Sequence, residues 1–369
     1  MTRIAAMETA QVSLPVRRDL VVRGARGAHD RSDFLLVRVR TDDGIDGYGE
    51  VSATPIWSGE DGASAEHFIR TALAPVLLGE PLVPAVLEAA MDRALAGNPF
   101  TKAGVSIALW DALAKRHAVP LAVLLGGGGP VRREVPVKLS LSGDGDELVR
   151  AHAAAAAAGF GAFKVKVGLG VAGDAARVRL ARELTGPDAF LGTDANGGWT
   201  RAEAAAAMRR LEAYAPDFVE QPLAPGDLAG LRELRALGFP LIADESVFGR
   251  DDLVRLIRAD AADVVSVYVG KAGGPARAVE LGRIAAAFGL GTVIGSNGEL
   301  GLGAAAQLHV ACALPELTTA FPSDIIGAHY YDEDVLAAPL AGDGRQVRLT
   351  EAPGLGVTIR DDILKLFGQ

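Results

Sequence analysis

Cysteine is almost absent from this sequence, since Cys312 is the only one among 369 residues. A single thiol excludes an internal disulfide framework and a zinc site built from cysteines. Long apolar runs are also missing, because no stretch approaches the roughly 18 uncharged apolar residues of a membrane-spanning helix. We therefore expect no membrane association, although 49% of the residues are hydrophobic.

Basic runs and stripes are missing as well, and the net charge is −9 with a pI near 5.3. Nucleic acid is therefore not an expected partner, because its binding depends on clustered lysine and arginine. The first residues, MTRIAAMETAQVSLPV, lack the basic region, the continuous apolar segment and the cleavage site of a secretory signal peptide. These absences favour a cytoplasmic protein that acts on small molecules.

The hydrophobic period changes within the first third of the chain. Residues 1 to about 50 alternate like antiparallel strands, and apolar residues from about 63 to 115 recur at helical spacing. This pattern predicts a small α+β domain over residues 1–130. The glycine-rich segment LLGGGGP at 124–130 is typical of a linker, because four successive glycines suit neither helix nor strand.

Beyond residue 130, short apolar runs alternate with helical stretches. The runs are VPVKLSLS, AFKVKVG, AFLGTDANG, DFVEQPL, PLIADES, ADVVSVYVGK, GTVIGSNGE and ELTTAFPSD. They predict a closed (β/α)₈ barrel of the TIM type over residues 131–325, with active-site groups at the carboxyl ends of the strands. Residues 326–369 are expected to return to the N-terminal capping domain. An open doubly wound sheet is the alternative, but no GxGxxG or phosphate-binding loop follows any strand.

Three isolated acids end three of these runs: Asp194 in FLGTDANGG, Glu220 in FVEQPL and Asp244 in LIADES. Buried acids are costly unless a partner neutralises them. Successive acids lie about one strand–helix repeat apart, so adjacent strands would bring them together. Three oxygen ligands without His or Cys suit a hard divalent ion such as Mg²⁺, or Mn²⁺. For each acid taken alone, the alternative is that it caps the following helix.

Two lysines, Lys164 and Lys166, lie two residues apart in FKVKVG and so share one face of a strand. A lysine near a metal and a second cation has its pKa lowered and can act as a base at neutral pH. Lys166 is the better base because it is nearer the end of the strand. Lys164 would bind a substrate carboxylate or depress the pKa of Lys166.

In this order, the motifs KVK, TDAN, VEQPL and ADES, together with NPFTKAGVSIALWDALAK, resemble the enolase superfamily and specifically its muconate lactonizing enzyme subgroup. The resemblance implies a capping domain built from both termini, and Mg²⁺ bound by Asp194, Glu220 and Asp244. It also implies abstraction of a proton α to a carboxylate, giving a metal-stabilised enolate. Residues expected to support this site from behind the ligands are Asn196, Glu245 and Lys271.

The sequence departs from this family at Tyr268, where members of the subgroup usually carry a second acid/base lysine. Tyrosine is a poor base at pH 7, although it can donate a proton or a hydrogen bond. Lys271 has the opposite strand parity and is expected to be structural. A one-base reaction with Lys166 is therefore expected, either a cycloisomerisation or an elimination of the dehydratase or lyase type in which Tyr268 protonates the leaving group.

Two alternatives remain open. The first is a racemase or epimerase of an amino-acid derivative that uses Lys166 with Tyr268 or Lys271. The second is a homologue that binds a metal or a ligand but has lost turnover. The intact lysine pair argues against the second, because a binding protein has little need for a base beside a metal.

The resemblance implies that two loops of the capping domain, near residues 18–31 and 54–60, select the substrate together with the eighth strand. The first loop is rich in arginine, which suggests either an anionic group on the substrate or a charged loop that faces solvent. Trp57 is expected to cover an apolar or cyclic substrate, and Asp324 to recognise an amino group. The remaining candidates for substrate binding are Lys138, Asn297 and Glu299. The six histidines form no evident dyad, and a homo-oligomer is expected from the family.

Overall fold

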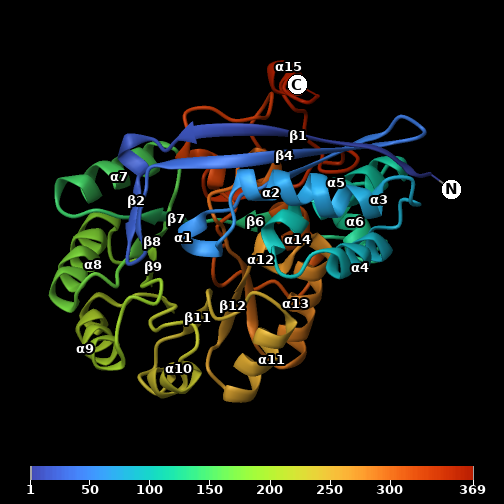
Figure 1. The fold of residues 1–369 in the computed structure, drawn as a ribbon. Helices are drawn as coiled ribbons and strands as arrows, with labels where there is room; N and C mark the ends of the chain where they lie inside the picture. The colour runs from blue at the N-terminus through green and yellow to red at the C-terminus, as the bar shows by residue number, and fades with distance from the viewer. Residues whose placement is uncertain (1, 369) are drawn as a thin grey trace.

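A three-stranded antiparallel sheet crosses the top of the computed structural model, which describes residues 2–368 (Figure 1). Its strands are ordered β1 (Ile4–Pro15), β4 (Arg31–Thr41) and β5 (Asp46–Val51). Helix α5 (Pro99–Arg116) packs tightly on the sheet because Gly49 faces Gly104, where any side chain would collide with backbone. The other helices of this layer are α1 (Pro55–Ser58), α2 (Gly62–Phe68), the π-helix η2 (Ile69–Leu73), α3 (Ala74–Leu77) and α4 (Pro84–Ala94).

A small hairpin extends from this layer toward the barrel (Figure 1). It consists of β2 (Val22–Gly24) and β3 (Gly27–His29) and follows the 3₁₀ turn η1 (Arg18–Leu20). The hairpin is attached to the barrel through Ser142, whose hydroxyl accepts a hydrogen bond from the Arg23 amide at 3.0 Å and donates one to the Val21 carbonyl at 2.8 Å. This connection holds the arginine-rich loop over the carboxyl ends of the barrel strands.

The barrel is built from seven parallel strands in sequential order, with helices outside them (Figure 1). The strands are β7 (Leu139–Leu141), β8 (Ala162–Lys166), β9 (Phe190–Asp194), β10 (Val219–Glu220), β11 (Leu241–Ala243), β12 (Val264–Val267) and β13 (Gly291–Ile294). The intervening helices are α7 (Asp146–Ala157), α8 (Val171–Thr185), α9 (Arg201–Leu211), η3 (Glu212–Tyr214), α10 (Leu228–Arg235), α11 (Arg250–Ala259), α12 (Val269–Ala272), α13 (Pro275–Ala287) and α14 (Gly301–Ala313). The predicted fold class, a TIM-type barrel with a capping domain, is confirmed.

The eighth run, ELTTAFPSD, differs from the prediction because it forms no regular strand within the described part of the chain. It still joins the ends of the sheet. Asp324 donates its amide to the Ile294 carbonyl at 2.8 Å, and the Lys138 amide donates to the Ser323 carbonyl at 3.0 Å. Pro322 has no N–H to give, which interrupts the ladder. Isolated bonds remain, and they include those from the Ser323 amide to the Pro136 carbonyl at 2.8 Å and from the Thr318 amide to the Thr292 carbonyl at 3.0 Å.

The C-terminal segment returns to the N-terminal layer. Strand β14 (Gln346–Arg348) pairs antiparallel with β6 (Glu134–Pro136), the Leu355 amide donates to the buried Asp111 on α5 at 2.8 Å, and the Phe367 ring lies 6.0 Å from that of Tyr48. The segment also contains η4 (Gly327–Tyr330) and α15 (Asp361–Leu364), and α6 (Leu121–Leu125) lies between α5 and the barrel.

The exact division of the chain at residues 130 and 325 stays a prediction. No helix within residues 2–368 is both long and apolar enough to cross a bilayer.

A buried carboxylate joins the capping layer to the barrel. Glu50, on β5, accepts hydrogen bonds at 2.8 Å from the amides of Leu300 and Gly303 at the start of α14, and one at 2.5 Å from Ser52. The carboxylate therefore satisfies two amides that have no partner inside the helix. Burial nevertheless raises the pKa of Glu50 from 4.5 to about 7, because these hydrogen bonds offset only part of the desolvation.

We expect Glu50→Gln to change how stability depends on pH. Because the pKa of Glu50 is higher in the folded than in the unfolded protein, its contribution to stability is lost as pH rises from about 4.5 to about 7. Relative to wild type, Glu50→Gln should therefore gain about 3 kcal/mol between pH 4.5 and 8. Urea unfolding at both pH values measures this, with the exposed Glu316→Gln as the control. Equal pH dependence in wild type and Glu50→Gln would contradict the assignment.

Candidate active site

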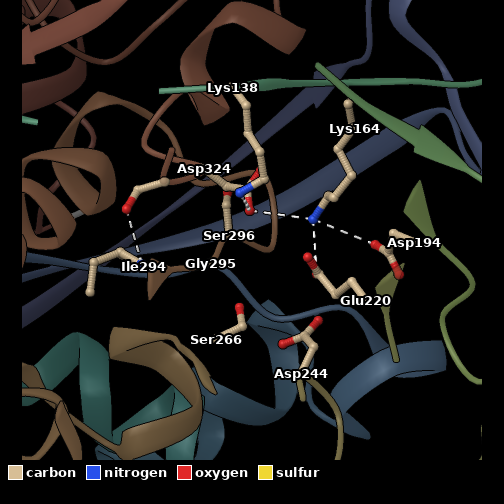
Figure 2. Close-up of polar contacts among 12 residues, drawn as sticks. Lys138, Lys164, Asp194, Glu220, Asp244, Ser266, Ile294, Gly295, Ser296 and Asp324 are labelled. Atoms are coloured by element: carbon tan, nitrogen blue, oxygen red, sulfur yellow. Dashed lines mark hydrogen bonds and ion pairs between the residues drawn. The ribbon is translucent and has the colours of Figure 1, made fainter. Parts of the chain in front are cut away.

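The carboxyl ends of neighbouring barrel strands place their charged side chains side by side. In the parallel register Lys166 on β8 pairs with Asp194 on β9, and Asp194 pairs with Glu220 on β10. Asp244 follows the last residue of β11. Residues in register on parallel strands point to the same face, so all four side chains enter the barrel interior. Figure 2 shows Lys164 with its ammonium group between Asp194 and Glu220.

Each of the three acids is held by a lysine. Lys166 Nζ lies 2.6 Å from Asp194 Oδ2, and Lys164 Nζ lies 2.9 Å from Glu220 Oε1 and 3.5 Å from Asp194 Oδ2. Lys271 Nζ lies 2.6 Å from Asp244 Oδ1. All of these groups are buried or nearly so, and the ion pairs therefore compensate charges that would otherwise be expensive to desolvate.

The ion pair between Lys166 on β8 and Asp194 on β9 moves the pKa values of its two members further apart. Burial alone would raise the pKa of Asp194, but Lys166 and Lys164 hold it below its usual value, at about 2. Burial alone would lower the pKa of Lys166, but Asp194 keeps it above its usual value. The predicted lowering for Lys166 assumed a metal beside the lysine and stays a prediction, whereas among the protein groups alone the Asp194 carboxylate acts in the opposite direction.

The donor set suits a hard divalent cation in its chemistry. Burial raises the pKa of Glu220, and its Oε2 is buried without a hydrogen-bond partner among the described residues. Such an oxygen calls for a ligand or a cation. Within residues 2–368, however, no three acidic, histidine or cysteine side chains are arranged to enclose a metal ion. The lysines account for this, because each acid is directed toward an ammonium group.

A second layer of polar groups surrounds Lys166. Asn196 accepts a hydrogen bond from Lys166 Nζ at 3.0 Å and donates one from Nδ2 to Glu245 Oε1 at 3.1 Å. Its backbone adopts a left-handed conformation with φ of 45°. Arg26, from the hairpin loop, lies 3.4 Å from the same Glu245 oxygen. The capping layer is thereby connected to the lysine through Glu245 and Asn196.

Tyr268 lies beside Asp244 on the other side of the site. It is buried, and its hydroxyl donates to Asp244 Oδ2 at 2.8 Å. Burial holds the pKa of Tyr268 well above 10, and the nearby carboxylates raise it further. Lys271 is on helix α12 and donates to the Asp244 carbonyl and to the Ser266 carbonyl as well as to the Asp244 carboxylate. Its ammonium group is occupied by these three oxygens.

Trp57 is the centre of an aromatic cluster. Its ring stacks on that of Tyr268 with centroids 5.4 Å apart and an interplanar angle of 9°, and on Phe248 at 5.4 Å and 28°. It contacts Phe100 edge-on at 6.0 Å. The predicted cover residue is thus wedged between the capping layer and the barrel. Asn297 strengthens the same junction by donating to the Ser52 carbonyl and the Thr54 hydroxyl, at 2.7 and 2.9 Å.

A cavity opens above the lysines, with about 980 Å³ of space between protein atoms, part of it open to solvent. Both the hairpin and the barrel contribute to its wall. Among the predicted site residues, those that line it are Lys164, Lys166, Tyr268, Trp57, Asn196, Asn297 and Asp324. Two predicted substrate-binding residues, Lys138 and Glu299, are buried and are not among its described lining residues. Glu299 instead bonds Ser296 and the Asn297 amide.

His29 lines the cavity; it belongs to the predicted substrate loop near residues 18–31, although the sequence gives no reason to single it out within that loop. Its Nε2 is hydrogen-bonded to Ser32 Oγ at 2.5 Å, and Ser32 Oγ to the Tyr331 hydroxyl at 2.6 Å. Burial lowers the pKa of His29 below 6.5. The histidine comes from β3 of the hairpin, so only the folded connection between hairpin and barrel brings it near the lysines.

Comparisons with known proteins find similarity to one family along nearly the whole chain. The model of the mandelate racemase / muconate lactonizing enzyme N-terminal domain matches residues 6–126, and that of the enolase C-terminal domain-like family matches residues 147–363. The N-succinyl-L-Arg/Lys racemase of Bacillus cereus is 31% identical over 98% of this chain and 97% of its own. Muconate cycloisomerase 1 of Rhodococcus opacus is 33% identical over 99% and 98%.

Solved structures give the same result. The muconate lactonizing enzyme of Pseudomonas fluorescens, complexed with muconolactone, superposes with a TM-score of 0.92 and 30% identity over 99% of both chains. The L-Ala-D/L-Glu epimerase of Bacillus subtilis gives 0.91 and 29%, covering 97% of this chain and 99% of its own. The similarity therefore includes both cycloisomerases and racemases or epimerases.

We expect Trp57→Ala to loosen the segment 54–60. The substitution removes three ring contacts, each worth about 1 kcal/mol beyond burial, so local opening should increase at least about tenfold. Hydrogen exchange of peptides covering this segment, followed by mass spectrometry, measures the change. Trp57→Phe is the matched control and should retain most of the protection. Unchanged exchange in Trp57→Ala would show that the cluster does not hold the segment.

Proposed function

The chain belongs to the mandelate racemase / muconate lactonizing enzyme family of the enolase superfamily, and from this we propose that Lys166 transfers a proton at the carbon next to a substrate carboxylate. The chain is accordingly an enzyme, and its named relatives are isomerases. The observation that carries the proposal is the position of Lys166, whose amine lines the cavity and lies 2.6 Å from Asp194. A general base must lie within hydrogen-bond reach of the proton that it removes, and a position on the cavity wall gives Lys166 access to the space where a substrate would bind.

Asp194, Glu220 and Asp244 would hold Mg²⁺, or Mn²⁺, in this proposal. The support is the type of donor, their position on three adjacent strands and the unpartnered oxygen of Glu220. When bound, the cation would neutralise negative charge that develops on the substrate carboxylate as the proton leaves. Lys164 would contribute its positive charge from below, and Asn196 would orient Lys166 through the 3.0 Å hydrogen bond.

A one-base reaction fits the other side of the site. The Tyr268 hydroxyl donates its proton to Asp244 at 2.8 Å and is thereby already engaged with one of the acids. Lys271 is occupied by three oxygens. We therefore favour a cycloisomerase related to the muconate enzymes. A related elimination by a dehydratase or lyase would require Tyr268 to protonate the leaving group.

The second candidate is racemisation or epimerisation of an amino-acid derivative. Its support is the similarity to the N-succinyl-L-Arg/Lys racemase and to the L-Ala-D/L-Glu epimerase. It would require a second acid or base on the face opposite Lys166. Tyr268, which occupies the position at which the family usually places a lysine, and Lys271 are the two candidates. A binding protein without turnover is the remaining alternative.

We expect Lys166→Ala to lower kcat by about 10²- to 10⁴-fold, because it removes the proton-transferring group. The assay uses whichever of muconate, N-succinyl-L-arginine and L-alanyl-L-glutamate wild type converts, with Mg²⁺ present. Titration calorimetry with Mg²⁺ should show that the variant still binds the cation. Lys102→Ala, in the capping layer, is the control. Full activity of Lys166→Ala would refute the assigned role, and no turnover by wild type on any candidate would favour the binding protein.

The number of bases can be measured in D₂O by proton NMR. With one base, recovered substrate should contain no deuterated molecules of inverted configuration, and Tyr268→Phe should lower kcat less than about tenfold because it removes one hydrogen bond. Inverted, deuterated substrate would instead establish the racemase. Loss of elimination activity by more than about a hundredfold in Tyr268→Phe would identify Tyr268 as the acid of a lyase reaction.

A further inference from the structure

Lys138 lies beneath the cavity with its side chain completely buried. It precedes β7, and its ammonium group donates to the Pro322 carbonyl at 2.6 Å and to Asp324 Oδ2 at 3.0 Å. Lys164 approaches the same carboxylate oxygen at 3.3 Å from β8. Figure 2 shows Lys138, from the segment before β7, and Lys164, from β8, meeting at Asp324. One carboxylate is thus shared by two ammonium groups of the protein.

Asp324 is also a lining residue of the cavity. A carboxylate in this position, if it lacked a partner, would attract the ammonium group of an incoming ligand, and the sequence indeed suggested recognition of an amino group. In the structure the protein's own lysine already supplies that positive charge. Lys138 cannot move aside into solvent, because it is enclosed and is held by Pro322 as well.

We propose that Lys138 takes the place of a substrate ammonium group at Asp324, so that the site selects carboxylates with no free amino group on that side. The inference rests on the proposed function, since it concerns the substrate of the same cavity. A ligand ammonium near Asp324 would meet Lys138 and Lys164 as like charges, and it would compete with Lys138 for the carboxylate that holds Lys138 at 3.0 Å. The substrate class is therefore a nitrogen-free dicarboxylate or an N-acylated amino acid.

This selection separates the named relatives by chemistry. Muconate carries no nitrogen, and an N-succinylated amino acid has an uncharged amide in place of its amine. L-Ala-D/L-Glu, by contrast, has a free amino terminus. The Lys138–Asp324 pair thus favours a substrate like muconate or an N-succinylated amino acid and disfavours one with a free amino terminus.

The test compares ligands that differ only in an ammonium group. One pair is glutarate and L-glutamate, and the other is N-propionyl-L-glutamate and L-alanyl-L-glutamate. Dissociation constants are measured by titration calorimetry on the Mg²⁺-loaded protein. Wild type should prefer the ammonium-free member of each pair at least about tenfold. Lys138→Met, which removes the charge, and Lys138→Gln, which keeps a donor for the Pro322 carbonyl, should each reduce this preference at least about fivefold.

Lys102→Met is the matched control, because Lys102 is also a buried lysine in an ion pair, with the partly exposed Asp92 at 2.9 Å, but in the capping layer. It should keep the wild-type preference. A wild type that favours the ammonium-bearing ligands would overturn the inference, as would an unchanged preference in both folded Lys138 variants. The readout is a ratio of binding constants and needs no turnover. Absence of proton exchange with every ligand would therefore count against the proposed reaction and not against Lys138.

Discussion

Charge compensation inside the barrel is the constraint on which the rest of this structure depends. Four carboxylates, those of Asp194, Glu220, Asp244 and Asp324, are buried at or near the ends of their strands. A buried charge is tolerated only when it is paired and hydrogen-bonded. The lysines that supply the pairing come from β8, from the start of β7 and from α12, so the position of each of these elements is linked to its neighbours through charge as well as through apolar packing.

The same need for charge compensation connects the capping layer to the lysines and carboxylates of the barrel. Arg26 reaches Glu245, and Asn196 connects Glu245 to Lys166, so the hairpin that covers the cavity also belongs to the polar network below it. On the other side, Trp57 stacks on Tyr268, which in turn bonds Asp244. The groups that cover the cavity are therefore connected through hydrogen bonds and ion pairs to the carboxylates below. The cover of the cavity and the orientation of Lys166 depend on the same contacts.

Much of the fold and the centre of the site could be predicted from the sequence, because both have local signals. Apolar runs ending in Asp194, Glu220 and Asp244 indicate parallel strands whose carboxyl ends meet, and the two-residue spacing of Lys164 and Lys166 gives their common face. Features that depend on distant partners could not be predicted. The burial of Lys138 follows from Asp324, and the position of His29 from the attachment of the hairpin at Ser142. The interruption of the eighth strand did have a local signal, since Pro322 lies within that run. The direction of the Lys166 pKa depends on how close Asp194 lies, which spacing alone does not give.

The return of the C-terminal segment has a consequence for how the chain is made. Asp111 on α5 receives a hydrogen bond from Leu355, β6 pairs with β14, and Tyr48 packs against Phe367. During synthesis on the ribosome, the first layer emerges long before these partners exist. Its last contacts must wait for the whole barrel to be translated, which makes them among the most non-local in the molecule. A chain truncated near its end would lose the bonds that close the top of the enzyme, even though every barrel strand had already been produced.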